Sequence, residues 1–338
     1  MTRPHRLAVV AGVFVLAVFP LIATPFLTVQ IGYQSLFLAT TALSLTFLAH
    51  YGGMLSLAQL AFYGVSGYTF AAVTVTYGLP WYAGAACALI ASTLIAFLFG
   101  LVAVRTQGIS FLMITLAMAM LLYFYAEQDR VFTNGHAGIN GIVPPGGPVA
   151  SHPIPYYYLA LAVSLTVYAA LRYAAQTPFG LSLQGIRDNP QRMRSIGYHV
   201  EAHRVAAFCL GGLVAGIGGV LGVWYNSAIS PGTIDLSRTI NLLVIAVVGG
   251  LAYVEGAFVG AFFVTLATNY ANSFTDRFNT AIGLTFLLIA VFSPQGLIGL
   301  AVRDRRAIGT GPPGTLDSAL VEPSATLGTT PPQTIESR

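Results

Sequence analysis

The stretch WYAGAACALIASTLIAFLFGLVAV, residues 81–104, contains no charged side chain and ends directly before Arg105. A helix needs about 20 apolar residues to cross the hydrocarbon core of a bilayer. A charge at the centre of such a helix costs roughly 2.5–3.5 kcal/mol on insertion scales, so charges mark the ends of the spans. The same pattern recurs along the chain and predicts about ten membrane segments. These segments are 7–28, 33–50, 54–77, 81–104, 109–126, 156–175, 204–226, 239–254, 256–272 and 279–301.

The composition of the whole chain agrees with an all-α polytopic membrane protein. Of 338 residues, 56% are hydrophobic and only 8% are charged, which excludes an ordinary soluble enzyme. All 15 basic residues are arginine, so the lysine of an ATP-binding P-loop is missing. No HExxH, GxSxG or paired CxxC motif is present, and Cys87 and Cys209 lie within apolar runs. We therefore expect no enzymatic activity, and no metal or cofactor bound by this chain.

The arginines indicate the orientation of the chain in the membrane. With the amino terminus in the cytoplasm, only Arg130, Arg238 and Arg277 of the 15 fall outside. Because the arginines lie at the ends of apolar runs, without interleaved aromatics, they predict topology and not nucleic-acid binding. The run 7–28 exceeds the apolar core of a signal peptide and is expected to remain as the first helix.

The segments between the spans differ in character. Residues 127–155 form an outside loop rich in glycine and proline, and residues 177–203 form the main cytoplasmic loop. Residues 1–303 constitute the membrane domain, whereas residues 304–338 have the composition of a disordered cytoplasmic tail, so that both termini are cytoplasmic. Glycines interrupt two regions, 33–77 and 239–272, and predict short or broken helices there. The interrupting residues are Gly52, Gly53, Gly249, Gly250 and Gly256.

The cytoplasmic loop carries the signals of a short helix. Asp188 or Asn189 can cap its amino end, and Pro190 suits its first position. Gly197 can adopt the left-handed conformation that ends it. On this helix Met193 and Ile196 share a face. The segment is either a solvated loop whose arginines only enforce topology or a docking helix for a soluble partner. The docking candidates are Asp188, Asn189, Pro190, Arg192, Met193, Arg194, Ile196 and Gly197.

Small residues recur at four-residue spacing in GGLVAGIGGVLG (residues 211–222) and EGAFVGAFF (residues 255–263). This spacing predicts close packing between helices, and it marks flexible segments along a path only secondarily. The candidates for helix packing are Gly212, Gly216, Gly219, Gly256 and Gly260.

Ionisable groups are almost missing from the predicted spans, which disfavours a proton-coupled transporter, although sodium coupling through carbonyl groups stays open. The polar residues inside the spans are neutral. For Gln59 and Asn241, an interhelical hydrogen bond and contact with a substrate are both possible roles. The candidates for lining a translocation path are Ser56, Gln59, Ser66, Thr115 and Asn241.

Several strings, in order, resemble those of LivM-type permease subunits of branched-chain amino-acid ABC importers. They run from about Tyr51 to Leu300. The family often has Gly-His where this chain has Ala58 and Gln59, which leaves the substrate open. The strings are YGGMLSLAQLAFYGVSGY, RTQGISFLMITLAMA, NGHAGINGI, TPFGLSLQGIRDNPQRMRSIGY, AFCLGGLVAGIGGVLG, ISPGTIDLSRTINLLVIAVVGG and FSPQGLIGL.

The resemblance implies an importer subunit in a bacterial inner or plasma membrane. Its partners would be two cytoplasmic ATP-binding subunits, which hold ATP and Mg, a second permease that is usually a different chain, and an extracytoplasmic binding protein. The loop 178–198 would then be the coupling segment that meets the ATPase. The same family includes permeases for urea, short amides and aromatic acids. A self-sufficient secondary transporter and a purely structural membrane subunit are the alternatives.

Overall fold

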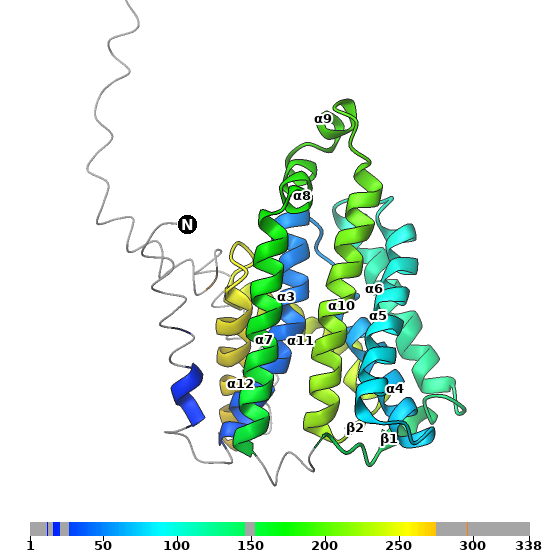
Figure 1. Ribbon diagram of the computed structural model, residues 1–338, viewed down its shortest axis with the longest axis vertical. Coiled ribbons are helices and arrows are strands. Elements are labelled where there is room, and N and C mark those ends of the chain that lie inside the picture. The colour runs from blue at the N-terminus through cyan, green and yellow to red at the C-terminus, as the bar shows by residue number, and fades with distance from the viewer. Residues whose placement is uncertain (1–11, 13–15, 21–26, 146–152, 275–295, 297–338) are drawn as a thin grey trace, which may run out of the picture. The chain divides into compact units, whose positions relative to one another are not determined.

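The computed structural model describes residues 12, 16–20, 27–145, 153–274 and 296, and the described chain is mostly helical (Figure 1). Within these residues, six helical stretches are long and apolar enough to cross a membrane. Most of the expected segments 7–28 and 279–301, and the whole tail 304–338, lie outside the described residues. The six stretches are Thr28–Gly52, Trp81–Ala103, Ile109–Gln128, Ile154–Gln176, Val200–Asn226 and Pro231–Gly249.

The helices follow the predicted segments with altered boundaries. The stretch Thr28–Gly52 consists of a π-helix, η1 (Thr28–Tyr33), and an α-helix, α3 (Gln34–Gly52). The remaining helices and strands are α4 (Gln59–Ala71), η2 (Ala72–Thr76), α5 (Trp81–Ala103), α6 (Ile109–Gln128), η3 (Gly135–Ala137), β1 (Ile139–Asn140), α7 (Pro153–Gln176), α8 (Pro178–Asp188), α9 (Pro190–Ser195), α10 (Val200–Asn226), β2 (Ala228–Ile229), η4 (Pro231–Thr233), α11 (Leu236–Gly249) and α12 (Gly256–Phe274).

Glycines end two helices where the sequence predicts interruptions. Helix α3 stops at Gly52, and Gly53 takes a left-handed conformation with φ 64°. Helix α11 stops at Gly249, followed by Gly250 with φ 108°. Glycine adopts such positive φ values without the steric penalty of a Cβ atom, so the chain can leave the helix at these points.

The expected segment 54–77, in the region predicted to have short or broken helices, consists of a non-helical stretch, residues 53–58, followed by α4 and η2. Hydroxyl groups satisfy part of its backbone. The Leu57 amide donates to Thr115 Oγ1 of α6 at 3.2 Å, and the Ala58 amide donates to Ser56 Oγ at 3.2 Å. Non-helical backbone at membrane depth is tolerated where protein surrounds it, which explains how the helix can start late.

Helix α10 is the centre of the described bundle and packs against α3, α4 and α5 (Figure 1). Its glycines permit these contacts. A Cβ atom on Gly212 would overlap the side chain of Ala96 on α5, and one on Gly219 would overlap the backbone oxygen of Tyr63 on α4. On another face, Gly218 lies against α3 in the same way. Three helices therefore approach α10 at distances that only glycine allows.

The other predicted packing glycines also lie at close contacts. Gly216 of α10 faces Ser92 of α5, where a Cβ atom would overlap the hydroxyl oxygen. Gly260 faces the backbone oxygen of Ile245, and a Cβ atom on Gly256 would lie 2.7 Å from the oxygen of Gly249. These last contacts bring α12 against α11, so the two helices form a closely packed pair.

Helix α10 connects two different ends of the bundle (Figure 1). It has 27 residues, which corresponds to a length of about 40 Å. One end follows α9, and the other leads into β2, which pairs antiparallel with β1 through Ile139 and Ile229. Gly138, with φ 65°, precedes this pairing, and a Cβ atom there would overlap the backbone oxygen of Ile229. We call the two ends the α9 end and the ribbon end.

Candidate functional site

The loop predicted between residues 177 and 203 contains two helices and not one. Helix α9 (Pro190–Ser195) is the predicted short helix, whereas α8 (Pro178–Asp188) was not predicted. Helix α10 begins at Val200, so residues 200–203 belong to it and not to the loop. The two short helices lie at the α9 end of the bundle (Figure 1).

Local signals in the sequence produce α9. Of the two candidate caps, Asn189 is the one used, since its side chain accepts a hydrogen bond of 2.9 Å from the Arg192 amide. Asp188 instead pairs with Arg187 at 3.0 Å. Pro190 occupies the first position of the helix, and Gly197, which follows the C-cap residue Ile196, has φ 95°. A side chain at Gly197 would be strained at this φ, which explains the glycine.

Met193 and Ile196, which the sequence predicts to share a face, differ in their surroundings. Met193 turns toward α8, where a Cβ atom on Gly185 would lie 2.9 Å from its sulfur. Ile196 follows α9 and is 63% exposed. Arg194 pairs with Glu201 on α10, and Arg192 is exposed on α9. Met193 therefore holds α9 on α8, and Ile196 is the apolar group that α9 presents outward.

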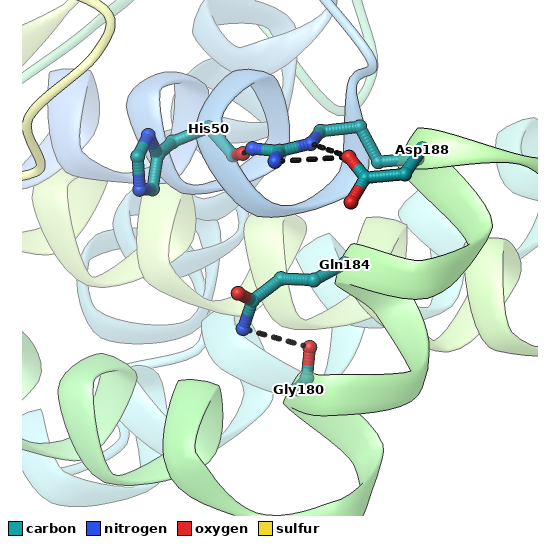
Figure 2. A network of polar contacts seen from close by, with 5 residues as sticks. His50, Gly180, Gln184 and Asp188 are labelled. Carbon is teal, nitrogen blue, oxygen red and sulfur yellow. Dashed lines mark hydrogen bonds and ion pairs between the residues drawn. The ribbon is translucent and has the colours of Figure 1, made fainter. Parts of the chain in front are cut away.

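Helix α8 is anchored to the membrane bundle. Leu183 and Ile186 are fully buried. A Cβ atom on Gly180 would overlap the backbone of Ala174 and Ala175, so α8 packs directly against the end of α7. Figure 2 shows Gln184 reaching the carbonyl of Gly180, a bond of 3.2 Å. Gln184 Nε2 also donates to the Ala175 carbonyl of α7 at 3.3 Å, and movement of α8 relative to α7 would break this bond and the packing of Gly180.

Arg187 joins α8 to the end of α3. Its Nη1 donates to the carbonyl oxygen of His50, while its Nε donates to Asp188 Oδ1 at 3.1 Å (Figure 2). The aliphatic part of the side chain also covers Gly53, where a Cβ atom would lie 2.6 Å from Arg187 Cγ. One arginine thus connects α8 to the residue that begins the non-helical stretch 53–58.

A second polar group links α7 to the turn before α12. Arg172 Nη1 lies 3.0 Å from Glu255 Oε1, and these side chains are only 20% and 15% exposed. Tyr168 donates its hydroxyl to the same carboxylate oxygen at 2.5 Å, and its ring lies 6.0 Å from the guanidinium carbon. The sequence placed Arg172 and Glu255 at segment ends but did not pair them.

Three of the predicted path residues come together at the start of α4. Ser56, Gln59 and Thr115 are all fully buried. Ser56 and Thr115 accept the backbone hydrogen bonds of residues 57 and 58 described above. Gln59 accepts a hydrogen bond from Ser44 Oγ of α3 at 2.9 Å. This cluster connects α3, α4 and α6.

The other two predicted path residues lie elsewhere. Ser66 donates to the carbonyl oxygen of Gly216 at 2.7 Å and so bonds α4 to α10. Asn241 is half-buried on α11, and its Oδ1 has no partner among the described residues. The structure therefore shows an interhelical bond for Ser66 and an available acceptor for Asn241.

A groove of about 940 Å³ lies between α5 and α10, near the start of α8. Its walls are mainly apolar, with Arg105 and Glu201 as the charged residues among them. None of the five predicted path residues lines it. Within the described parts of the chain, no three His, Cys, Asp or Glu residues gather as they would to hold a metal ion.

Known proteins resemble this chain over most of its length. The family model for the permease component of the branched-chain amino acid transport system matches residues 27–292. The chain is 22% identical to the high-affinity branched-chain amino acid transport system permease protein LivM of Escherichia coli K12 over 306 residues, covering 82% of this chain and 72% of that protein. No solved structure matches significantly.

Two shorter similarities lie within the same class of membrane proteins. The probable branched-chain amino acid transport permease protein LivH of Methanocaldococcus jannaschii is 30% identical over 134 residues, covering 37% of this chain and 42% of that protein. The nucleoside ABC transporter permease protein NupC of Lactococcus lactis is 36% identical over 73 residues, covering 22% and 21% respectively. Because the family match spans most of the helical bundle, this multi-pass membrane protein belongs to the family of branched-chain amino acid ABC transporter permeases.

Proposed function

We propose that the chain is one membrane subunit of an ATP-driven importer that takes up a branched-chain amino acid across the bacterial inner membrane. Two cytoplasmic subunits would bind and hydrolyse ATP with Mg, since the chain has no lysine for a P-loop of its own. A second permease subunit, of different sequence, and an extracytoplasmic binding protein complete the assembly. Family membership supports the transport role, and the remaining parts are our proposal.

The observation that carries this proposal is the pair α8–α9. Helix α9 has no buried residue, and Ile196 and Tyr198 beside it are 63% and 43% exposed. Large exposed apolar side chains directly after a short projecting helix, next to exposed arginines, are suited to docking a soluble partner. Helix α8, in contrast, is fixed to α3 and α7. A partner that binds α9 would therefore act on the bundle through α8.

Arg187 and the contact of α8 with α7 would carry this movement into the membrane domain. ATP-driven closure of the partner subunits would displace α8 and α9 as one body. The ends of α3 and α7 would follow, because Arg187 binds the His50 carbonyl and Gly180 leaves no gap against α7. The helix pairs packed through glycine on α10, α11 and α12 would then reorient and alternate access to a central path.

The transported solute is proposed from the family and not from a binding pocket. The LivM and LivH relatives are named for branched-chain amino acids, whereas NupC is named for nucleosides. Selectivity of such an importer would reside largely in the separate binding protein. Urea, short amides and aromatic acids are the alternative solutes. The outside loop 130–155, of which residues 130–145 and 153–155 are described, and residues 229–238 are proposed to receive the binding protein.

Replacement of Ile196 by aspartate tests the docking of the ATP-binding subunits. The charge would face an apolar surface of the partner, and we expect these subunits to be lost when the membrane subunit is purified in mild detergent. Val131→Asp is the matched control, because Val131 is 95% exposed in the loop after α6, toward the ribbon end. Met193 is unsuitable because its substitution would separate α9 from α8. Retention of the ATP-binding subunits by the Ile196→Asp variant would refute the docking role of α9.

Reconstitution distinguishes the importer from a self-sufficient secondary transporter. Liposomes that contain this chain alone, with a proton or sodium gradient, should not accumulate leucine. Liposomes that contain the full assembly should accumulate it only with ATP and the binding protein. Gradient-driven uptake by the chain alone would establish the secondary transporter instead.

A further inference from the structure

The amino end of α4 lies inside the protein without a cap. The cap position is Ala58, and no side chain bonds to the first turn. Gln59, Leu60 and Ala61 are at most 4% exposed. Among the residues that the structure describes, their backbone N–H groups find no acceptor. Buried amide groups are almost always paired in native proteins, so three unpaired ones at one helix end require an explanation.

The side chain of Gln59 adds a second, independent donor at the same place. It is fully buried, and its Oε1 accepts the bond from Ser44. Its Nε2 has no partner in the described chain. On α10, a Cβ atom built on Gly211 would lie 3.5 Å from this Nε2. The start of α4 therefore has backbone donors and a buried side-chain donor that find no acceptor among the described residues.

We infer that the amino end of α4, together with the Gln59 amide, is a subsite for a carboxylate, namely that of the solute during its passage through the protein. Unpaired N–H groups and the helix dipole attract negative charge, and interrupted membrane helices use their ends in this way. All the donors described here are neutral. Neutral donors hold an anion weakly enough to release it, which a conducting path requires. The inference rests on the proposed transport function.

The subsite is connected to the α9 end by a short piece of backbone. Residues 53–58 lead directly to it, and Gly53 at their start is covered by Arg187 of α8. Ser56 and Thr115 fix the last residues of this stretch by the bonds already described. Displacement of α8 therefore moves the chain that covers the α4 end. The subsite is buried in this structure and would open to the solute when that stretch shifts.

Thermal unfolding of the purified full-length chain tests the subsite without transport. Sodium isobutyrate, a simple carboxylate, should raise the unfolding midpoint of the natural protein, whereas sodium chloride at equal ionic strength should not. Gln59→Glu should unfold at a higher temperature than the natural protein without any ligand, because its own carboxylate would occupy the donors. It should also lose the response to isobutyrate. Equal stabilisation by chloride would overturn the assignment in favour of an inorganic anion site.

Uptake by the reconstituted full assembly provides the second measurement. Gln59→Leu and Gln59→Glu should each lower ATP-driven leucine uptake at least tenfold while the ATP-binding subunits still co-purify. Gln59→His, which keeps an N–H donor, should retain part of the activity. Gln107→Glu is the control, because Gln107 is exposed between α5 and α6. Unchanged uptake in both Gln59→Leu and Gln59→Glu would overturn the subsite, whereas failure of the natural assembly to use ATP would overturn the proposed function itself.

Discussion

At the scale of single residues, the ion pair of Arg172 and Glu255 is the clearest feature that the sequence did not predict. The two residues are far apart in the chain, and they meet because α7 and α12 both pack on α3. Sequence reasoning placed both at the ends of spans, where charges are expected. Pairing depends on tertiary packing, and a single sequence contains no direct signal of it.

Removal of either partner should destabilise the protein more than removal of both. In Glu255→Gln, Arg172 would keep its charge in a largely buried place without its partner, and we expect a loss of about 1–3 kcal/mol of unfolding free energy. The double variant Arg172→Gln with Glu255→Gln should recover part of this loss. Thermal unfolding of the four proteins in detergent measures the coupling. Additive effects of the two substitutions would contradict a direct interaction.

At the start of α4, the sequence predicted the polar residues but not the position at which the helix begins. The sequence indicated that Ser56, Gln59 and Thr115 were polar groups within spans. It indicated an interruption at Gly52 and Gly53 but not that the next helix begins as late as Gln59. Ser56 and Thr115 accept the amide hydrogen bonds of this non-helical backbone, and the position of Thr115 depends on the packing of α6.

At the scale of secondary-structure elements, glycine and proline gave the most reliable predictions. Gly53 and Gly250 lie where helices end, and Asn189 and Pro190 begin α9 as expected. Helix α8 was missed although Thr177 and Pro178 form the same kind of start signal. The missed helix lies directly beside the predicted one and is short, so the pattern was assigned to the loop.

Helix packing around α10 can be tested with two glycine substitutions of opposite expected sign. Gly219→Ala would place a methyl group onto the backbone oxygen of Tyr63, which no side-chain rotation can relieve, and we expect a loss of about 1–3 kcal/mol. Gly100→Ala, in α5, would meet the side chain of Phe208 at an ordinary 3.4 Å. It should be neutral or stabilise by up to about 1 kcal/mol, since alanine favours helix. Comparable unfolding midpoints for both variants would argue against close packing at Gly219.

At the scale of the whole molecule, composition predicted the class of protein, and the order of the strings predicted the family. Both outcomes agree with the structure and the comparisons. Composition did not predict the number of helices, because apolar length alone does not distinguish a spanning helix from an interrupted one. The orientation in the membrane stays a prediction based on the arginines, since a chain without its bilayer carries no sidedness of its own.

Single cysteines test this orientation. The background for this test is a variant in which Cys87 and Cys209 are replaced by serine. One new cysteine is then introduced at a time, either Gln191→Cys on α9 or Val131→Cys in the loop after α6. Both positions are exposed. A membrane-impermeant maleimide added to intact cells, with access through the outer envelope, should label Val131→Cys. It should label Gln191→Cys only after the inner membrane is opened. The reverse pattern would show that the arginine rule misassigns this chain.

The small ribbon of β1 and β2 has a mechanical consequence. By pairing residues 139–140 with 228–229, it closes the intervening chain, from α7 through α10, into a loop tied at its base. Helix α10 leads from this base to α9 and is about 40 Å long. The ribbon therefore fixes the base of α10, and one continuous helix joins this base to α9 while packing against α3, α4 and α5. Any displacement of α9 that is passed along α10 would have to be accommodated by these three helices and by the ribbon together.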